Sequence, residues 1–245
     1  MRNKIFILII AAIVMASIMA LSGPAAIFIA KRQLKNTFKG SIVTIEQCKI
    51  NPLNSIIFSG IEINEPSSYN IKCEQISMWY DLYSLLTKGI VEFSASGFFG
   101  GKVDGNIKIT LGKSSAYTAD INLRNIDLDM FVENFKLEKK MQVTGRFGGN
   151  IFIKGAGSRL EEITGNLQAI SPGGRLTIKD TDYLKSIPVK SGVSWEDLVA
   201  SLKNYVYNIG TLKTSFENDN LIFTVSLSGE TGKRNFTVVL HDFKI

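Results

Sequence analysis

Downstream of residue 40, apolar and polar residues alternate over most of the chain. A period of two is typical of β-strands that bury one face. The alternation is most regular over 103–111, 117–123, 141–153, 221–227 and 236–240, and less regular over 41–49, 55–63, 71–80, 89–97, 159–170, 174–179 and 207–217. Short turns bearing Gly, Asn or Ser join these segments, so consecutive strands are expected to pair antiparallel. The sequence therefore predicts a mainly β fold with a long antiparallel sheet of about twelve strands.

Helical patterning is scarce and is limited to short stretches at 81–88, 127–136 and 194–205. These helices are too few to cover such a sheet, and an open apolar face is not left to water. The face can close into a barrel or sandwich, pair with another chain, or curl into a groove that holds an apolar ligand. On the pattern alone, the self-packed core is favoured over the other two arrangements.

The longest apolar segment lies at the N-terminus, over residues 5–30, and contains no charge. As a continuous helix it would reach about 39 Å at 1.5 Å per residue, enough to cross a hydrocarbon core of about 30 Å. We therefore predict an N-terminal stub and transmembrane anchor over residues 1–32, followed by one β-rich domain over residues 33–245. A cleaved signal peptide is one alternative, but its apolar core is usually shorter. A buried globular helix is the other, but a run this long without a polar face would need protein on every side.

The net charge of +6 belongs to the flanks of this apolar segment. Six cations precede Glu46, the first acidic residue, which leaves 28 − 6 = 22 basic and 22 acidic residues downstream. A neutral body does not favour nucleic acid as a partner. The cations on the two sides of the segment do not decide its orientation. Those that follow it suit anionic lipid headgroups in either topology: Lys31, Arg32, Lys35 and Lys39.

Catalytic and metal motifs are weak. One histidine and two cysteines cannot supply a zinc site of the usual His/Cys kind, and no cofactor is predicted. The stretch 229–234 has two residues between its glycines and Arg after Lys, whereas a phosphate loop needs four and then Ser or Thr. His241 and Asp242 are adjacent in a predicted strand, so they point to opposite faces. Carboxylate pairs such as Asp127 and Asp129 suit helix caps or polar turns. We therefore predict no enzyme and no catalytic residue.

The two cysteines, Cys48 and Cys73, both fall in predicted strands near the N-terminal edge of the sheet. Outside the cytoplasm they could form a disulfide if those two strands are neighbours. The alternative is two buried thiols that behave as small apolar side chains.

Several short stretches resemble AsmA-like envelope proteins. The opening of the body does so through SGIEI at 59–63 and ISMWYDL at 76–82, placed after the anchor. The C-terminal third is similar to the YdbH-like branch, described in places as a dicarboxylate transport domain, through PGGRLTI at 172–178, LKNYVY at 202–207 and LSG at 227–229. The likeness covers most of residues 40–245 and brings no catalytic residue.

This resemblance implies a curved, taco-like β-groove with an apolar interior, anchored by one helix in the inner membrane and projecting into the periplasm. It thereby implies that the stub before the anchor is cytoplasmic. Such a protein would bind or transfer phospholipid between envelope membranes. Its partners would be phospholipid, the inner membrane through residues 5–30, and an envelope or outer-membrane protein. The residues expected to line the groove alternate along the strands: Ile107, Ile109, Ile121, Leu123, Phe147, Ile151, Val225, Leu227, Val238 and Leu240. A second resemblance, to the GspN-like component of type II secretion systems, implies a structural or assembly role.

Overall fold

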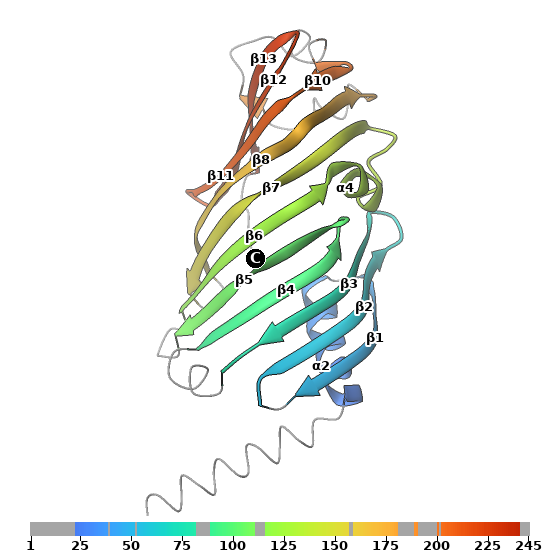
Figure 1. Ribbon diagram of the computed structural model, residues 1–245, viewed down its shortest axis with the longest axis vertical. Coiled ribbons are helices and arrows are strands. Elements are labelled where there is room, and N and C mark those ends of the chain that lie inside the picture. The colour runs from blue at the N-terminus through green and yellow to red at the C-terminus, as the bar shows by residue number, and fades with distance from the viewer. Residues whose placement is uncertain are drawn as a thin grey trace, which may run out of the picture.

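A computed structural model describes residues 23–240 apart from 39, 52, 82–88, 111–115, 157–158, 181–188, 191–199 and 201. These residues form one open antiparallel sheet of 13 strands and two helices (Figure 1). The strands are β1 (Ile42–Asn51), β2 (Ser55–Glu65), β3 (Tyr69–Trp79), β4 (Ile90–Phe98), β5 (Gly101–Thr110), β6 (Ala116–Asp127), β7 (Met141–Ala156), β8 (Arg159–Ile178), β9 (Val189–Lys190), β10 (Tyr205–Tyr207), β11 (Ile209–Glu217), β12 (Asn220–Gly229) and β13 (Gly232–Leu240). The helices are α2 (Gly23–Thr37) and α4 (Leu128–Asn134). The prediction of a mainly β fold is confirmed.

Most strands pair with the strand that follows them in the chain. The order runs from β1 to β8 and continues through β11, β12, β13 and β9, while β10 pairs with β8 beside this path. All pairs are antiparallel, as the short turns predict. The predicted segments 159–170 and 174–179 form one strand, β8, because the chain continues through an irregularity at 171–174 without turning back.

Local irregularities keep the apolar residues on one face of the sheet. Gly60 has a φ of +63°, and the pairing of β2 skips this position opposite both Glu46 and Glu74. In a regular strand, residues three apart point to opposite faces. Phe58 and Ile61 nevertheless pack in the same hydrophobic cluster. The alternation therefore shifts by one position at Gly60, opposite Glu46 and Glu74, and a single apolar face is preserved without a change in the strand register.

Helix α2 lies against one end of this apolar face. Ile27, Ala30 and Leu34 recur at helical spacing and pack against the cluster formed by β1 to β6. The opposite side of the helix exposes Phe28 and Ile29, with 67% and 50% of their surface accessible. Packing against the sheet therefore accounts for the apolar residues on only one side of α2.

The predicted division between residues 32 and 33 falls inside α2, whose side chains on both sides of that point contact the sheet. The boundary stays a prediction, and the part of the chain that the structure describes includes α2 from Gly23 onward. Within the described part of the chain, neither helix combines the length and the apolar character that a membrane crossing needs. Residues 5–22 of the predicted anchor lie outside the described residues.

Helix α4 confirms the predicted helix at 127–136, although it is shorter. The Asp127 carboxylate caps it by accepting hydrogen bonds from the backbone N–H groups of Asp129 at 2.9 Å and Met130 at 3.4 Å. The end predicted for the helix at 194–205 is wrong, because Tyr205 begins β10, and most of that stretch lies outside the described residues, as does 82–88.

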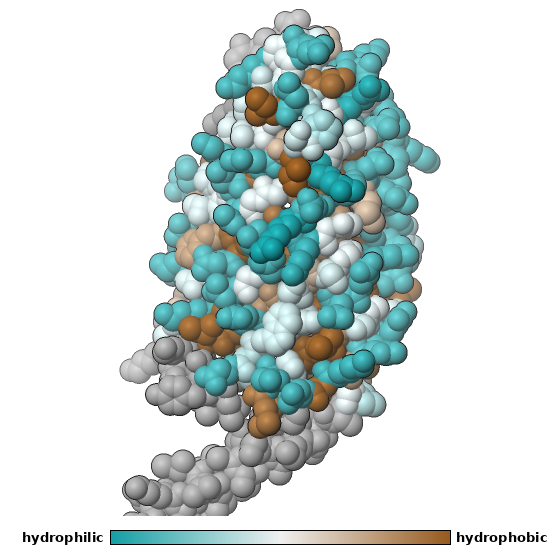
Figure 2. All heavy atoms as spheres, in the orientation of Figure 1, coloured by the Kyte–Doolittle hydropathy of each residue, from teal (hydrophilic) through white to brown (hydrophobic). Residues whose placement is uncertain are grey.

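The two faces of the sheet differ in character. In Figure 1, α2 lies behind the sheet, so the apolar face that it contacts is turned away from the viewer. Figure 2 shows that the face turned toward the viewer is mostly hydrophilic, with separate apolar patches. The core therefore sits on the far face, as three hydrophobic clusters.

Candidate functional site: an apolar pocket

The strand register places all ten predicted lining positions on the apolar face. Directly paired residues of antiparallel strands point to the same side of the sheet. Ile121 pairs with Ile151, for example, and Leu167 of β8 pairs with both Gly149 of β7 and Leu212 of β11. When the pairs are followed from β5 to β13, each predicted position falls on this one side.

Four of these residues line an apolar pocket of about 390 Å³: Leu123, Phe147, Val225 and Leu227. The pocket lies between the first two of the three hydrophobic clusters. The first cluster includes Val43, Ile61 and Phe99, the second includes Phe147, Leu176 and Tyr207, and the third consists of Leu160, Ile163 and Leu221. Its other lining residues come from the turn after β4, from the region of α4, and from β7, β8 and β10 to β13: Phe98, Phe99, Ile126, Leu128, Phe131, Val143, Leu167, Leu176, Tyr207, Thr211, Leu212 and Phe236. The volume lies at the lower end of the range for ligand pockets, about 300 to 1,000 Å³.

The pocket is almost entirely apolar. Among its described lining residues, only Tyr207 and Thr211 carry a polar side-chain atom, and none is charged. The Tyr207 hydroxyl donates a hydrogen bond to the backbone oxygen of Thr144 at 2.8 Å, so its polar atom is satisfied away from any ligand. Such a lining offers dispersion contacts and burial to a hydrocarbon but almost no hydrogen bonds to a polar ligand.

An aromatic wall closes one side of the pocket. The ring of Phe99 lies 4.3 Å from that of Phe98, 5.4 Å from Phe131 and 5.9 Å from Phe135, measured between centroids. Phe99 and Gly100 form the two-residue turn between β4 and β5, with φ of +45° and +68°. Asn, Asp or Gly usually occupies such a left-handed position. A buried Phe here indicates that ring packing offsets the cost of the backbone conformation.

The six other predicted residues lie outside the pocket. Ile121 packs against the first cluster and Ile151 against the third, while Ile109 has 41% of its surface exposed. Ile107 and Val238 are half-buried, and Leu240 is assigned by register alone. The apolar face is therefore larger than the pocket that it contributes to.

Some of the pocket residues missed in the sequence, Phe98, Phe99 and Ile126 among them, lie where the alternation breaks. The pairing of β6 with β7 shifts between Leu123 and Ile126, next to Asn125 with a φ of +55°. The adjacent Phe98 and Phe99 also violate a period of two. The signal for these residues was the run of large apolar residues beside Gly or Asn.

Tyr207 forms part of the pocket lining and is the most deeply buried large side chain among the described residues, with 1% of its surface exposed. Gly174 pairs with it in β8, and a Cβ there would lie 2.6 Å from the Tyr207 hydroxyl. Burial raises the pKa of Tyr207 to about 12, because the phenolate would lose its hydration.

We expect this pKa to make the fold sensitive to alkali. The unfolded phenol ionises near pH 10 and the folded phenol near pH 12, so the stability that Tyr207 contributes is complete below pH 10 and is lost as the pH rises to 12. The loss amounts to about 3 kcal/mol at most. Tyr207→Phe has no phenol to ionise, so we expect it to lack this loss of stability between pH 10 and 12. At pH 7 we expect the variant to be less stable by about 1 kcal/mol, because it lacks the hydrogen bond. Urea unfolding of both proteins from pH 8 to 12 measures the difference. If the free energy of unfolding fell with pH by the same amount in both proteins, the loss of stability would not come from Tyr207.

The two cysteines are not brought together. β2 lies between β1 with Cys48 and β3 with Cys73, whereas a disulfide needs Cα atoms closer than about 7 Å. Both are free thiols, and desolvation raises the pKa of each. The suggested disulfide is therefore wrong for this structure, because the condition of neighbouring strands is not met.

Within the described chain, no group of three or more His, Cys, Asp or Glu side chains is placed to hold a metal ion. His241 and Asp242 lie outside that part of the chain. A scan of protein-family models, a search of curated proteins and a search of solved structures each find no match to this sequence. The AsmA-like and GspN-like resemblances therefore stay predictions.

Proposed function

We propose that this chain is a non-catalytic lipid-binding protein that takes a hydrocarbon chain of a phospholipid into the apolar pocket and transfers or retains that lipid in the cell envelope. One observation carries the proposal: a pocket of about 390 Å³ with no described charged residue in its lining, on the apolar face of an open sheet. A solvent-filled cavity of this character would be unfavourable, so an apolar occupant stabilises it.

Strands that lie far apart in the sheet contribute residues to one pocket, which supports a curved β-groove. Phe98 belongs to β4 and Phe236 to β13, which lie seven strand positions apart in the sheet order. In a flat sheet they would be separated by about 34 Å, at about 4.8 Å per strand. Both residues line the same pocket, which favours a sheet curled around an elongated apolar interior.

Helix α2 supports a position beside a membrane. Phe28 and Ile29 are exposed on the side turned away from the sheet, and Lys31, Arg32 and Lys35 follow them in the same helix. Apolar and cationic side chains in this order suit the interface of a bilayer with anionic headgroups. In the sequence, residues 23–30 of this helix are also the last part of the apolar segment 5–30 that we propose as the anchor. The AsmA-like resemblance adds the proposed inner-membrane anchor, the periplasmic orientation and an envelope protein as partner.

A structural or assembly role is the second candidate. It is favoured by the first cluster, which α2 and the Phe135 ring after α4 cover with the chain's own side chains. In that case the apolar pocket would hold no lipid, and the open sheet edges would bind other proteins.

Site-specific photo-crosslinking separates these two functions. Leu212 lines the pocket, whereas the next residue, Lys213, faces the opposite side of the same strand. We would place a photoreactive diazirine amino acid of about the size of leucine at each position in the full chain and irradiate cells whose phospholipids carry phosphorus-32. We expect a radiolabelled adduct at position 212 and none at position 213. A folded protein that gives no adduct at 212, or equal adducts at both positions, would contradict lipid binding in the pocket.

A further inference from the structure

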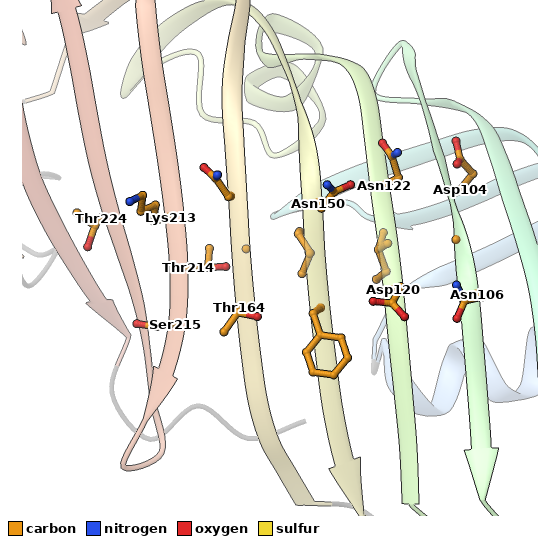
Figure 3. Close-up of a pocket in the computed structure, with 16 residues that line it drawn as sticks. Asp104, Asn106, Asp120, Asn122, Asn150, Thr164, Lys213, Thr214, Ser215 and Thr224 are labelled. Carbon is orange, nitrogen blue, oxygen red and sulfur yellow. The ribbon is translucent and has the colours of Figure 1, made fainter.

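A second hollow, of about 770 Å³, lies on the hydrophilic face of the sheet (Figure 3). Its side chains, all but one of them polar in the two rows named below, stand in rows across the strands, because each residue pairs directly with the next across the sheet. The first row runs through Asp104, Asn122, Asn150, Asn166, Lys213 and Thr224. The second row runs through Asn106, Asp120, Phe152, Thr164 and Ser215.

The residue types in these rows are unusual for the middle of a sheet. Asn and Asp are among the residues least favoured in strands, yet Asn122, Asn150 and Asn166 face one another on β6, β7 and β8. Elsewhere on this face, cross-strand charge pairs occur, such as Lys72 with Glu62 at 3.7 Å. Sheet formation therefore does not by itself account for the amides in the hollow.

The polar groups of the hollow are largely unused within the protein. Among the described residues, Asp104 is the one polar side chain of the two rows with an internal partner, the Arg124 guanidinium at 3.0 Å. The second carboxylate oxygen of Asp104, Oδ1, is buried without a hydrogen bond. Buried polar atoms in native proteins normally have partners. These amides, hydroxyls and carboxylates are therefore available to a ligand.

The chemistry of the hollow matches a neutral polyhydroxylated ligand. Amides both donate and accept hydrogen bonds, as sugar hydroxyls do. Arg124 offsets the charge of Asp104, and Asp120 and Lys213 carry opposite charges, so a polyanion would gain little. Phe152 lies between Asp120 and Thr164 in the second row and provides an apolar surface beside the polar groups. We infer that this hollow is a binding site for a short neutral oligosaccharide, independent of the lipid pocket on the other face.

Saturation-transfer NMR on the full chain tests this inference. The protein is held in lauryldimethylamine oxide micelles, because this detergent carries no sugar that could compete. The probes are three neutral trisaccharides: maltotriose, cellotriose and N,N′,N″-triacetylchitotriose. We expect saturation transfer to at least one of them, with affinity reduced at least tenfold in the double variant Asn150→Ala/Asn166→Ala.

Lys154→Ala is the matched control, since Lys154 lies on β7 beyond the hollow and pairs with Glu161 at 3.2 Å. We expect this variant to bind like the unmodified protein, and circular dichroism checks that both variants fold. Absence of transfer to all three sugars would overturn the inference, as would unchanged binding in the folded double variant. A change in oligomeric state of the double variant without sugar binding would likewise overturn it, in favour of a protein contact.

The two proposals fail separately. The lipid adduct at position 212 depends on the apolar face and is expected to persist in Asn150→Ala/Asn166→Ala. Loss of sugar binding with retention of that adduct is the expected result for two independent sites. A variant that loses both would overturn the independence of the hollow from the pocket.

Discussion

Replacement of Val225 by Trp is expected to reduce the lipid adduct at position 212 more than about tenfold while the fold stays intact. Val225 pairs with Leu212 on one side and with Phe236 on the other, and all three line the pocket. A larger apolar side chain usually strains a packed core, at a cost of about 1 to 3 kcal/mol. Here the pocket offers about 390 Å³ of unfilled space, so the indole would occupy the volume meant for a hydrocarbon chain. Photo-crosslinking and thermal unfolding of Val225→Trp measure the two effects.

Ile109→Trp is the matched control. Ile109 shares the apolar face with Val225 but lies outside the pocket, with 41% of its surface exposed. We expect this variant to keep the adduct. An adduct retained by Val225→Trp, or lost equally in Ile109→Trp, would show that the lipid does not occupy the pocket. Val225→Asp is less informative, because an unpaired charge on this face also destabilises the fold.

The apolar face of the sheet was predictable from alternation and short turns. Both properties are local: a period of two assigns side chains to faces, and a short turn fixes which strands pair. The pairing of Ile107 with Ala119 and of Val225 with Phe236 follows directly from them. For this reason all ten predicted positions fall on one side of the sheet.

The pocket itself was not predictable from the same pattern. A single extra residue reverses the assignment of faces further along a strand. The irregularity between Leu123 and Ile126 does so in β6 and places Ile126 and Leu128 in the pocket. The pocket also depends on Phe98 and Phe236 lining one cavity from distant strands, which no local pattern specifies.

The hydrophilic hollow depends on register in a similar way. In the sequence, Asn122, Asn150 and Asn166 are ordinary polar positions of three separate strands. The pairing of β6, β7 and β8 brings these three amides side by side on one face of the sheet, which the sequence of each strand alone does not show. Each strand therefore contributes to two chemically different surfaces, and β11 does so with the adjacent residues Leu212 and Lys213.

Truncation of Phe99 is expected to cause the largest loss of stability of any single change proposed here. Phe99→Ala removes a ring that is 6% exposed and contacts Phe98, Phe131 and Phe135. Loss of a buried Phe costs about 3 to 5 kcal/mol. Urea unfolding measures this cost, and Phe131→Ala is the control, with a smaller effect expected because Phe131 is 37% exposed.

Phe99→Gly separates the packing of this ring from the conformation of its backbone. Both variants lose the ring, but only glycine adopts a φ of +45° without steric cost. We therefore expect Phe99→Gly to be more stable than Phe99→Ala by about 1 kcal/mol. If the glycine variant were the less stable one, the left-handed turn would not be a source of strain. If both variants lost less than about 1 kcal/mol, the aromatic wall of the pocket would not be a major part of the core.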